Sequence, residues 1–181
     1  MKFSETKLTG LYIAEPEPFK DERGLFFRTF CKNVFTEIEH YKEFVQINQS
    51  INICKGTFRG LHYQLPPFKD VKLVRCISGS VIDIIVDVRK ESDTFLKSFL
   101  IELSEENKRM IYIPEGFAHG FITLEDNTQL IYHHTSFYQP KHEGSLNIND
   151  CALNIKLPIK PRIMSKVDKN IPFVDDTFEG I

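Results

Sequence analysis

Short runs of apolar and β-branched residues, separated by turn residues, recur along most of the chain. Many such runs with few helices predict an all-β sandwich or barrel. Only Lys32–Tyr41 has apolar residues at helical spacing. The predicted strands are Leu11–Ala14, Phe44–Asn48, Val71–Ile77, Val81–Val88, Phe99–Leu103, Met110–Ile113, Phe121–Leu124 and Gln129–His134.

A turn signal, Gly79-Ser80, joins the two longest of these runs. If the two residues form a tight hairpin turn, the register places Lys72 opposite Asp87. Ionic and apolar side chains then share one face of the hairpin.

A second turn signal, Asp126-Asn127, predicts another hairpin. Its register places His119 opposite His134, on the same face as Tyr132. Polar groups that gather on an otherwise apolar face indicate the mouth of a barrel, where a ligand can bind.

Length and charge narrow the class of protein. A chain of 181 residues indicates one domain, and its net charge of −2 argues against a basic nucleic-acid-binding scaffold. No apolar run approaches the roughly 20 residues of a membrane span, and the N-terminus lacks the apolar stretch of a secretory signal. The four cysteines have no paired spacing, which excludes zinc-ribbon and CxxC motifs. We expect a cytoplasmic protein with reduced thiols.

Two segments, Gly56–Gln64 and Pro114–Phe121, resemble the signature regions of the cupin superfamily. In metal-binding cupins the first supplies His-x-His and the second supplies Pro-x-Gly-x-x-His. The second pattern is complete and includes His119, but Gln64 stands where the first needs another histidine after His62. Two imidazoles are too few for a stable metal site. The resemblance implies a cupin-type double-stranded β-helix, a jelly-roll barrel with a few short helices, that binds no metal.

A narrower resemblance spans almost the whole chain in the right order. The matching stretches are Asp21–Phe27, Phe44–Ser50, Gly56–Gln64, Lys72–Arg75, Gly79–Arg89, Ile113–Phe121, Tyr138–Pro140 and Ser165–Asp168. They are similar to the dTDP-4-dehydrorhamnose 3,5-epimerase family. The resemblance implies a cofactor-independent isomerase that acts on a nucleotide-linked 4-keto-6-deoxyhexose, with dTDP-4-dehydro-6-deoxyglucose as substrate and dTDP-4-dehydrorhamnose as product.

The chemistry of such a reaction needs three groups. A ketone at C4 acidifies the hydrogens on C3 and C5, so inversion needs a base, a group that stabilises the enolate, and an acid on the opposite ring face. The resemblance assigns the base to His62 with Asp168 as its partner, and the acid to Tyr132. It places Lys72 near the C4 oxyanion, whereas the alternative role of this lysine is an ion pair with Asp87.

The resemblance also implies a set of substrate-binding residues. They are Arg23, Arg59 and His119 for the diphosphate and sugar, Gln46 and Asn48 for the nucleotide, and Tyr138 with Glu143 at the same end. One placement needs explanation, because Arg59 and His62 are an odd number of residues apart and point to opposite faces of an unbroken strand. Either Gly60 supplies a bulge or Arg59 reaches the cavity around its rim.

The chain departs from the family pattern at several positions. Arg28 stands where glutamate is usual, His133 and His134 follow Tyr132 where lysine is usual, and Asn147–Asp150 replaces a Trp-Asn-Asp sequence. The base and the acid are unaffected. A different nucleotide, a different 4-keto sugar, or inversion at C3 alone therefore stays open.

Two other function classes also stay open. One is a metal-dependent cupin oxygenase or isomerase with His62, His119 and His134 as ligands. The other is a sugar-nucleotide-binding module without activity, although binding alone does not require a base and an acid.

Members of the family are typically homodimers that exchange their N-terminal segments. We therefore expect one domain, 1–181, in which the strands of residues 1–50 contribute to a dimer and residues 149–181 wrap around the barrel. In that arrangement Arg23 serves the cavity of the neighbouring subunit.

Overall fold

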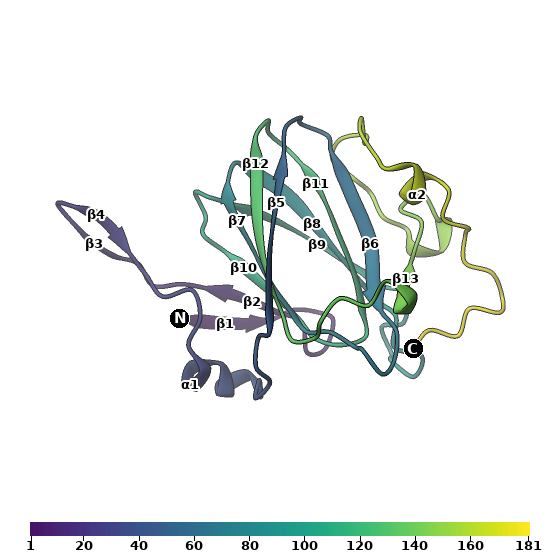
Figure 1. The fold of residues 1–181 in the computed structure, drawn as a ribbon, viewed down its shortest axis with the longest axis horizontal. Coiled ribbons are helices and arrows are strands. Elements are labelled where there is room, and N and C mark those ends of the chain that lie inside the picture. The colour runs from purple at the N-terminus through teal and green to yellow at the C-terminus, as the bar shows by residue number, and fades with distance from the viewer.

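The computed structural model describes residues 1–181, and two antiparallel sheets facing each other form its body (Figure 1). The first sheet has the order β1 (Lys2–Glu5), β2 (Tyr12–Glu15), β10 (Met110–Ile113), β7 (Lys72–Ser78), β12 (Thr128–His134) and β5 (Gln46–Asn52). The second has the order β13 (Glu143–Ser145), β6 (Phe58–Gln64), β11 (Phe117–Thr123), β8 (Ser80–Asp87) and β9 (Ser98–Ser104). The prediction of an all-β barrel is confirmed.

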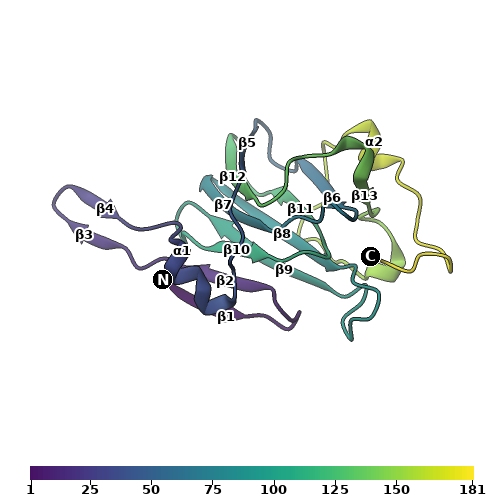
Figure 2. The same cartoon turned by 60° about the horizontal axis from the view of Figure 1, so that its bottom comes forward.

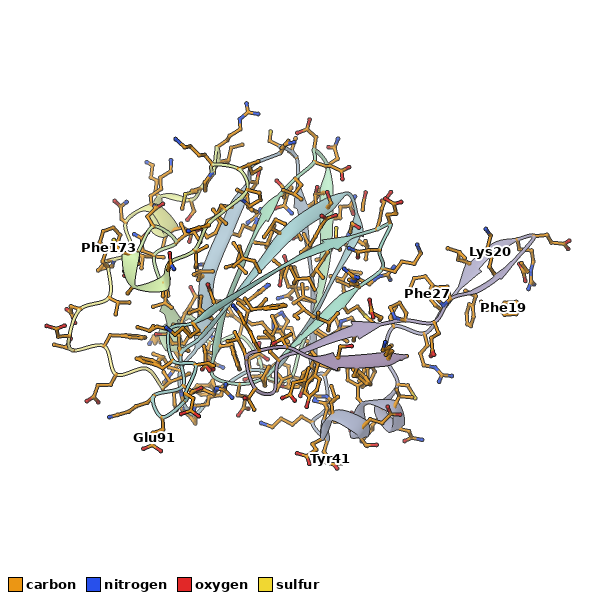
Figure 3. All side chains as sticks on the ribbon, turned by 180° about the vertical axis from the view of Figure 1, so that it is seen from behind. Phe19, Lys20, Phe27, Tyr41, Glu91 and Phe173 are labelled. Carbon is orange, nitrogen blue, oxygen red and sulfur yellow. The ribbon has the colours of Figure 1, made fainter.

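One hairpin stands apart from the two sheets. Its strands, β3 (Phe19–Asp21) and β4 (Gly24–Phe26), pair only with each other, and it projects away from the barrel (Figures 1 and 2). Figure 3 shows Phe19 and Lys20 on the projecting part and Phe27 where the hairpin joins the body. The guanidinium of Arg75 lies over the ring of Phe27, 4.7 Å from its centroid.

The helices are all short. They are α1 (Lys32–Phe35), η1 (Thr36–Ile38), η2 (Pro140–His142), η3 (Cys151–Leu153) and α2 (Lys166–Lys169). The helix predicted at Lys32–Tyr41 is thus one turn of α-helix and one of 3₁₀-helix, which ends at Glu39 in the left-handed conformation with φ of 56°. None of these helices has the length and apolar character that crossing a membrane requires.

Both predicted hairpins are wrong. Only Gly79 separates β7 from β8, yet β7 pairs with β10 and β12 whereas β8 pairs with β11 and β9 in the other sheet. The chain likewise changes sheets between β11 and β12. A central position suits β8, because its side chains are buried on both faces. Gly79 permits the crossing, since it has φ of +70° and a Cβ there would lie 2.6 Å from Thr128 Oγ1.

The crossing also removes the predicted contact between Lys72 and Asp87. Asp87 instead accepts hydrogen bonds from Arg89, Ser92 and Thr94. Lys72 is therefore available for another role.

Apolar side chains fill most of the space between the sheets. Val74, Ile85, Phe121 and Leu130 belong to this cluster, and Tyr132 packs against it. A second cluster covers the other face of the five-stranded sheet, where the C-terminal part of the chain contributes Leu146, Ile148 and Leu153 among others. The polar side chains that interrupt the first cluster define the site described next.

Candidate active site

A cavity of about 250 Å³ lies between the sheets, and its walls come from β5, β6, β7, β11 and β12. A second cavity of about 160 Å³ adjoins it. Asn48, His62, Lys72 and His134 line both, so the two form one continuous cleft. The predicted site residues that line the first cavity are Asn48, Arg59, His62, Lys72, His119 and Tyr132. Gln46, Tyr138 and Glu143 line the second.

His62 is bonded to a carboxylate from the far end of the chain. Its Nε2 lies 3.0 Å from Oδ1 of Asp168, which is buried in the first turn of α2. Ser165 caps that turn, because its hydroxyl accepts a hydrogen bond of 2.9 Å from the backbone N–H of Asp168. The carboxylate fixes the imidazole tautomer and leaves Nδ1 available to accept a proton. The His62 side chain is 35% exposed and is open to the cavity.

Lys72 lies beside His62 but comes from the other sheet. Its Nζ donates to the backbone oxygen of His62 at 3.3 Å and makes no ion pair. Burial lowers the pKa of Lys72, and the carboxylates of Asp70, Glu143 and Asp83 oppose that shift. Two of its three N–H groups therefore remain for a ligand, which suits an anion or a polarised carbonyl oxygen.

Tyr132 lies among polar partners at the edge of the apolar cluster. Its hydroxyl is 2.9 Å from Ser50 Oγ, and its ring stacks on that of His134 at 6.2 Å between centroids. Burial raises the pKa of Tyr132, so the phenol keeps its proton at neutral pH. The His119 ring lies 6.2 Å away across the barrel, not along one sheet face as the predicted hairpin required.

Gly60 explains how Arg59 and His62 reach the same cavity. In the pairing of β6 with β11, His62 faces His119 but Arg59 faces Phe121, so the register shifts between them. Gly60 has φ of +132°, and a Cβ there would lie 2.5 Å from the Cα of Gly120. Only glycine fits this close approach. The irregularity occurs at the position that the sequence indicated.

The second cavity has a hydrogen-bonded wall. The amide of Gln46 donates to Asn48 Oδ1 at 3.3 Å and accepts from the backbone N–H of Tyr138 at 3.2 Å. The carboxylate of Glu143 raises the pKa of Tyr138. Amides, a carboxylate and an aromatic ring on one wall suit a heterocyclic base with its sugar.

Carboxylates that the sequence analysis did not assign hold two further histidines. Asp83 binds Nε2 of His119 at 2.9 Å, and Asp70 binds Nδ1 of His134 at 2.7 Å. Asp83 lies in the middle of a largely apolar run, between Ile82 and Ile84, and this placement is the signal in the sequence for the first pair. Ser50, the hydrogen-bond partner of Tyr132, was also missed.

Arg23 is the predicted site residue that the structure does not bring to the cleft. It lies at the turn of the projecting hairpin, pairs with Asp21 at 2.5 Å, and has a side chain that is 83% exposed. It lines neither cavity of its own chain.

The residues present do not fit a resident metal ion. No three His, Cys, Asp or Glu side chains are arranged to hold one.

The cavity of this jelly-roll barrel holds a carboxylate-bound histidine, a lysine and a buried tyrosine, which are side chains suited to acid–base chemistry. The sequence profile of the dTDP-4-dehydrorhamnose 3,5-epimerase family matches residues 5–176, and the chain belongs to that family. A relative of that name from Shigella flexneri is 44% identical over 171 residues, which cover 94% of each chain.

Solved structures of relatives have the same fold. The dTDP-4-dehydrorhamnose 3,5-epimerase from Bacillus anthracis, with TDP and PPi bound, superposes with a TM-score of 0.92 at 37% identity over 96% of this chain and 99% of that one. The dTDP-6-deoxy-D-glucose-3,5-epimerase from Legionella pneumophila, in complex with dTDP-4-keto-L-rhamnose, has a TM-score of 0.87 at 38% identity over 92% and 89%.

Proposed function

We propose that this chain is a cytoplasmic isomerase that inverts C3 and C5 of dTDP-4-dehydro-6-deoxyglucose to give dTDP-4-dehydrorhamnose, without a cofactor. One observation supports it above the rest: His62, bonded to Asp168, and Tyr132 line one cavity from different sheets, with Lys72 beside His62. The relatives above carry this activity in their names, and two of them hold dTDP-type ligands.

The proposed reaction proceeds through an enolate. His62 Nδ1 takes a proton from the carbon next to the ketone, and Asp168 stabilises the imidazolium that forms. The ammonium of Lys72 stabilises the negative charge that develops on the C4 oxygen. Tyr132 then delivers a proton to the opposite face of the same carbon, which inverts it. Lys72 and the buried carboxylates supply this electrostatic environment before the substrate arrives.

The remaining cleft residues bind the nucleotide portion in this proposal. Arg59 and His119 contact the diphosphate and the sugar, since a guanidinium offers paired donors to phosphate oxygens. Gln46, Asn48, Tyr138 and Glu143 bind the nucleoside. The polar lining of the second cavity, which adjoins the first, supports that placement.

The proposal includes a homodimer in which the projecting hairpin reaches the partner. Three large apolar residues on that hairpin are at least half exposed: Phe19 at 64%, Leu25 at 50% and Phe26 at 79%. Apolar groups on a projecting two-stranded element favour burial against another chain. Arg23 then reaches the cavity of the partner subunit.

The experiment is solvent exchange. The protein is incubated in D₂O with dTDP-4-dehydro-6-deoxyglucose, and deuterium at C3 and C5 and the configuration of each carbon are followed by NMR. We expect incorporation with inversion at both carbons, and loss of both in His62→Asn but not in the matched control His142→Asn. Exchange that survives His62→Asn contradicts the proposal.

Another outcome of this experiment and two further measurements identify the alternatives. Incorporation at C3 alone defines a 3-epimerase. Stabilisation against heat by UDP, GDP or CDP rather than dTDP identifies another nucleotide, because a ligand that binds only the folded state raises the melting temperature. Stoichiometric metal in the purified protein favours the metal-dependent class.

A further inference from the structure

Four side chains of the site form one hydrogen-bonded chain. Arg59 Nε donates to Asn52 Oδ1 at 2.9 Å, Asn52 Nδ2 lies 3.3 Å from Ser50 Oγ, and Ser50 Oγ lies 2.9 Å from the hydroxyl of Tyr132. The chain connects a fixed positive charge to the proposed acid. Neither Ser50 nor Asn52 has a role in the reaction described above.

The orientation of the Asn52 amide is forced by its surroundings. Arg59 can only donate hydrogen bonds, so the oxygen of the amide must face it. The backbone oxygen of Thr128 can only accept, and it lies 3.2 Å from Nδ2. The two constraints agree, and they make Asn52, which is only 2% exposed, a donor to Ser50 Oγ.

This orientation sets the direction of the next bond. Ser50 Oγ accepts from Asn52, and the hydroxyl of Tyr132 is its one other hydrogen-bond partner. If Ser50 donates its proton to Tyr132 Oη, every group in the chain donates toward the cavity. The phenol proton is then free to point at the substrate. If Tyr132 donated to Ser50 instead, the serine proton would have no acceptor within the protein, although Ser50 also lines the cavity, and the phenol proton would point away from the substrate.

We infer that Asn52 and Ser50 are positioning residues that direct the proton of Tyr132 into the cavity and stabilise the phenolate left after proton transfer. This inference rests on the proposed function. In the step concerned, the O–H bond of Tyr132 breaks and its electron pair stays on the oxygen. The enolate C=C pair forms the new C–H bond while the C4 carbonyl is restored. The phenolate regains a proton from water, and the imidazolium of His62 releases one to water, so the cycle balances.

Asn52→Asp tests the direction of the chain, because it keeps the shape of the side chain and replaces the donor by an acceptor. Ser50 then donates to the new carboxylate, and Tyr132 donates to Ser50. His62 still removes and returns protons, so we expect exchange without inversion. The ratio of deuterium incorporation to inversion, measured as above, should rise at least about 10-fold, within the range of a lost general acid.

Three further variants separate positioning from damage to the fold. Ser50→Ala removes the last link and should raise the same ratio, whereas Ser50→Thr keeps a hydroxyl and should restore it to within about threefold of the wild type. Asn33→Asp makes the same chemical change at an exposed position on α1 and should change nothing. An unchanged ratio in both Asn52→Asp and Ser50→Ala, with a wild type that inverts, overturns the inference.

A second measurement does not depend on activity. A difluorotyrosine placed at position 132 titrates in an accessible range, and its ionisation can be followed by ¹⁹F NMR. Loss of the Ser50 donor should raise its pKa in Ser50→Ala and in Asn52→Asp, but not in Asn33→Asp. Equal titrations in all these proteins overturn the inference, even if no sugar nucleotide reacts. A wild type that neither exchanges nor inverts any 4-keto sugar contradicts the proposed function instead.

Discussion

The cleft and the projecting hairpin both carry residues proposed to act on one substrate. The surrounding sheets fix the cleft residues, whereas the hairpin has no contact of this kind. His62, Lys72 and Tyr132 lie on β6, β7 and β12, each of which is paired on both sides. Each of these side chains has a hydrogen-bond partner within its own chain. Arg23 lies in the turn between two strands that pair only with each other, and it bonds only to Asp21 two residues away.

The proposed proton-transfer groups therefore lie in a different part of the molecule from one of the proposed substrate-binding residues. The groups proposed for proton transfer are complete within one subunit and are fixed by sheet pairing. The hairpin exposes three large apolar side chains and a guanidinium, and an isolated two-stranded hairpin is marginally stable in water. We therefore expect changes in the cleft to affect kcat, and changes in the hairpin to affect KM through a second subunit.

Asp168→Asn should give the largest effect. The amide cannot stabilise the imidazolium of His62 and can hold the wrong tautomer, so kcat should fall by about 10³-fold or more. The affinity for dTDP, measured by calorimetry, should stay within about twofold because Asp168 lines neither cavity. Asp176→Asn, in the same C-terminal segment but exposed, is the matched control. A kcat within a few-fold of the wild type would contradict the role given to Asp168 as the partner of His62.

Lys72→Met should lower kcat by about 10²-fold, the effect of removing one donor from an oxyanion site. The same lysine should set the alkaline limb of the pH profile. Burial lowers the pKa of Lys72 from its ordinary 10.5, so the ammonium is lost, and activity falls, as pH rises through that lowered value. Burial raises the pKa of Tyr132, so the phenol is expected to keep its proton at a higher pH than the one at which Lys72 loses its own.

A variant that lacks the phenol of Tyr132 tests whether Lys72 produces the alkaline limb of the pH profile. Tyr132→Phe should retain deuterium exchange by His62, and the pH profile of that exchange should show the same alkaline limb. Disappearance of the limb in Tyr132→Phe would assign it to the phenol and would contradict the role given to Lys72.

The sequence located the site better than it located the strands around it. Gln46, Asn48, Arg59, His62, Lys72, His119, Tyr132, Tyr138 and Glu143 all line the cleft, although both predicted hairpins are wrong. The motifs specify residue types at the cavity. The pairing of β8 depends instead on burial of both its faces, which a local turn signal cannot reveal.

The missed residues share one physical reason. Ser50, Asn52, Asp70 and Asp83 act through a hydrogen bond to another side chain, and three of these bonds join residues far apart in the sequence. Such contacts depend on the pairing of strands from distant parts of the chain. Only the bond between Asn52 and Ser50 is local, and alternation along one strand places both side chains on the same face.

Arg23→Ala tests whether the projecting hairpin contributes to substrate binding. We expect KM to rise about 10-fold with kcat little changed, because one phosphate contact is lost and the proton-transfer groups are intact. Mixed dimers of Arg23→Ala with His62→Ala then decide which cavity Arg23 serves. If it serves the partner, each mixed dimer contains one fully native cavity and recovers low-substrate activity. If it serves its own chain, mixing recovers nothing.

Ser165→Ala should give the smallest effect. It tests how firmly the C-terminal segment holds Asp168 against His62. The cap fixes the single turn of α2 that carries Asp168, so its loss should lower the free energy of unfolding by about 1 kcal/mol. Because Asp168 then spends less time bonded to His62, kcat should fall a few-fold with KM unchanged. Ser165→Thr keeps the accepting oxygen and should behave as the wild type. A rise in KM instead would mean that this segment, like the hairpin, contributes to binding rather than to proton transfer.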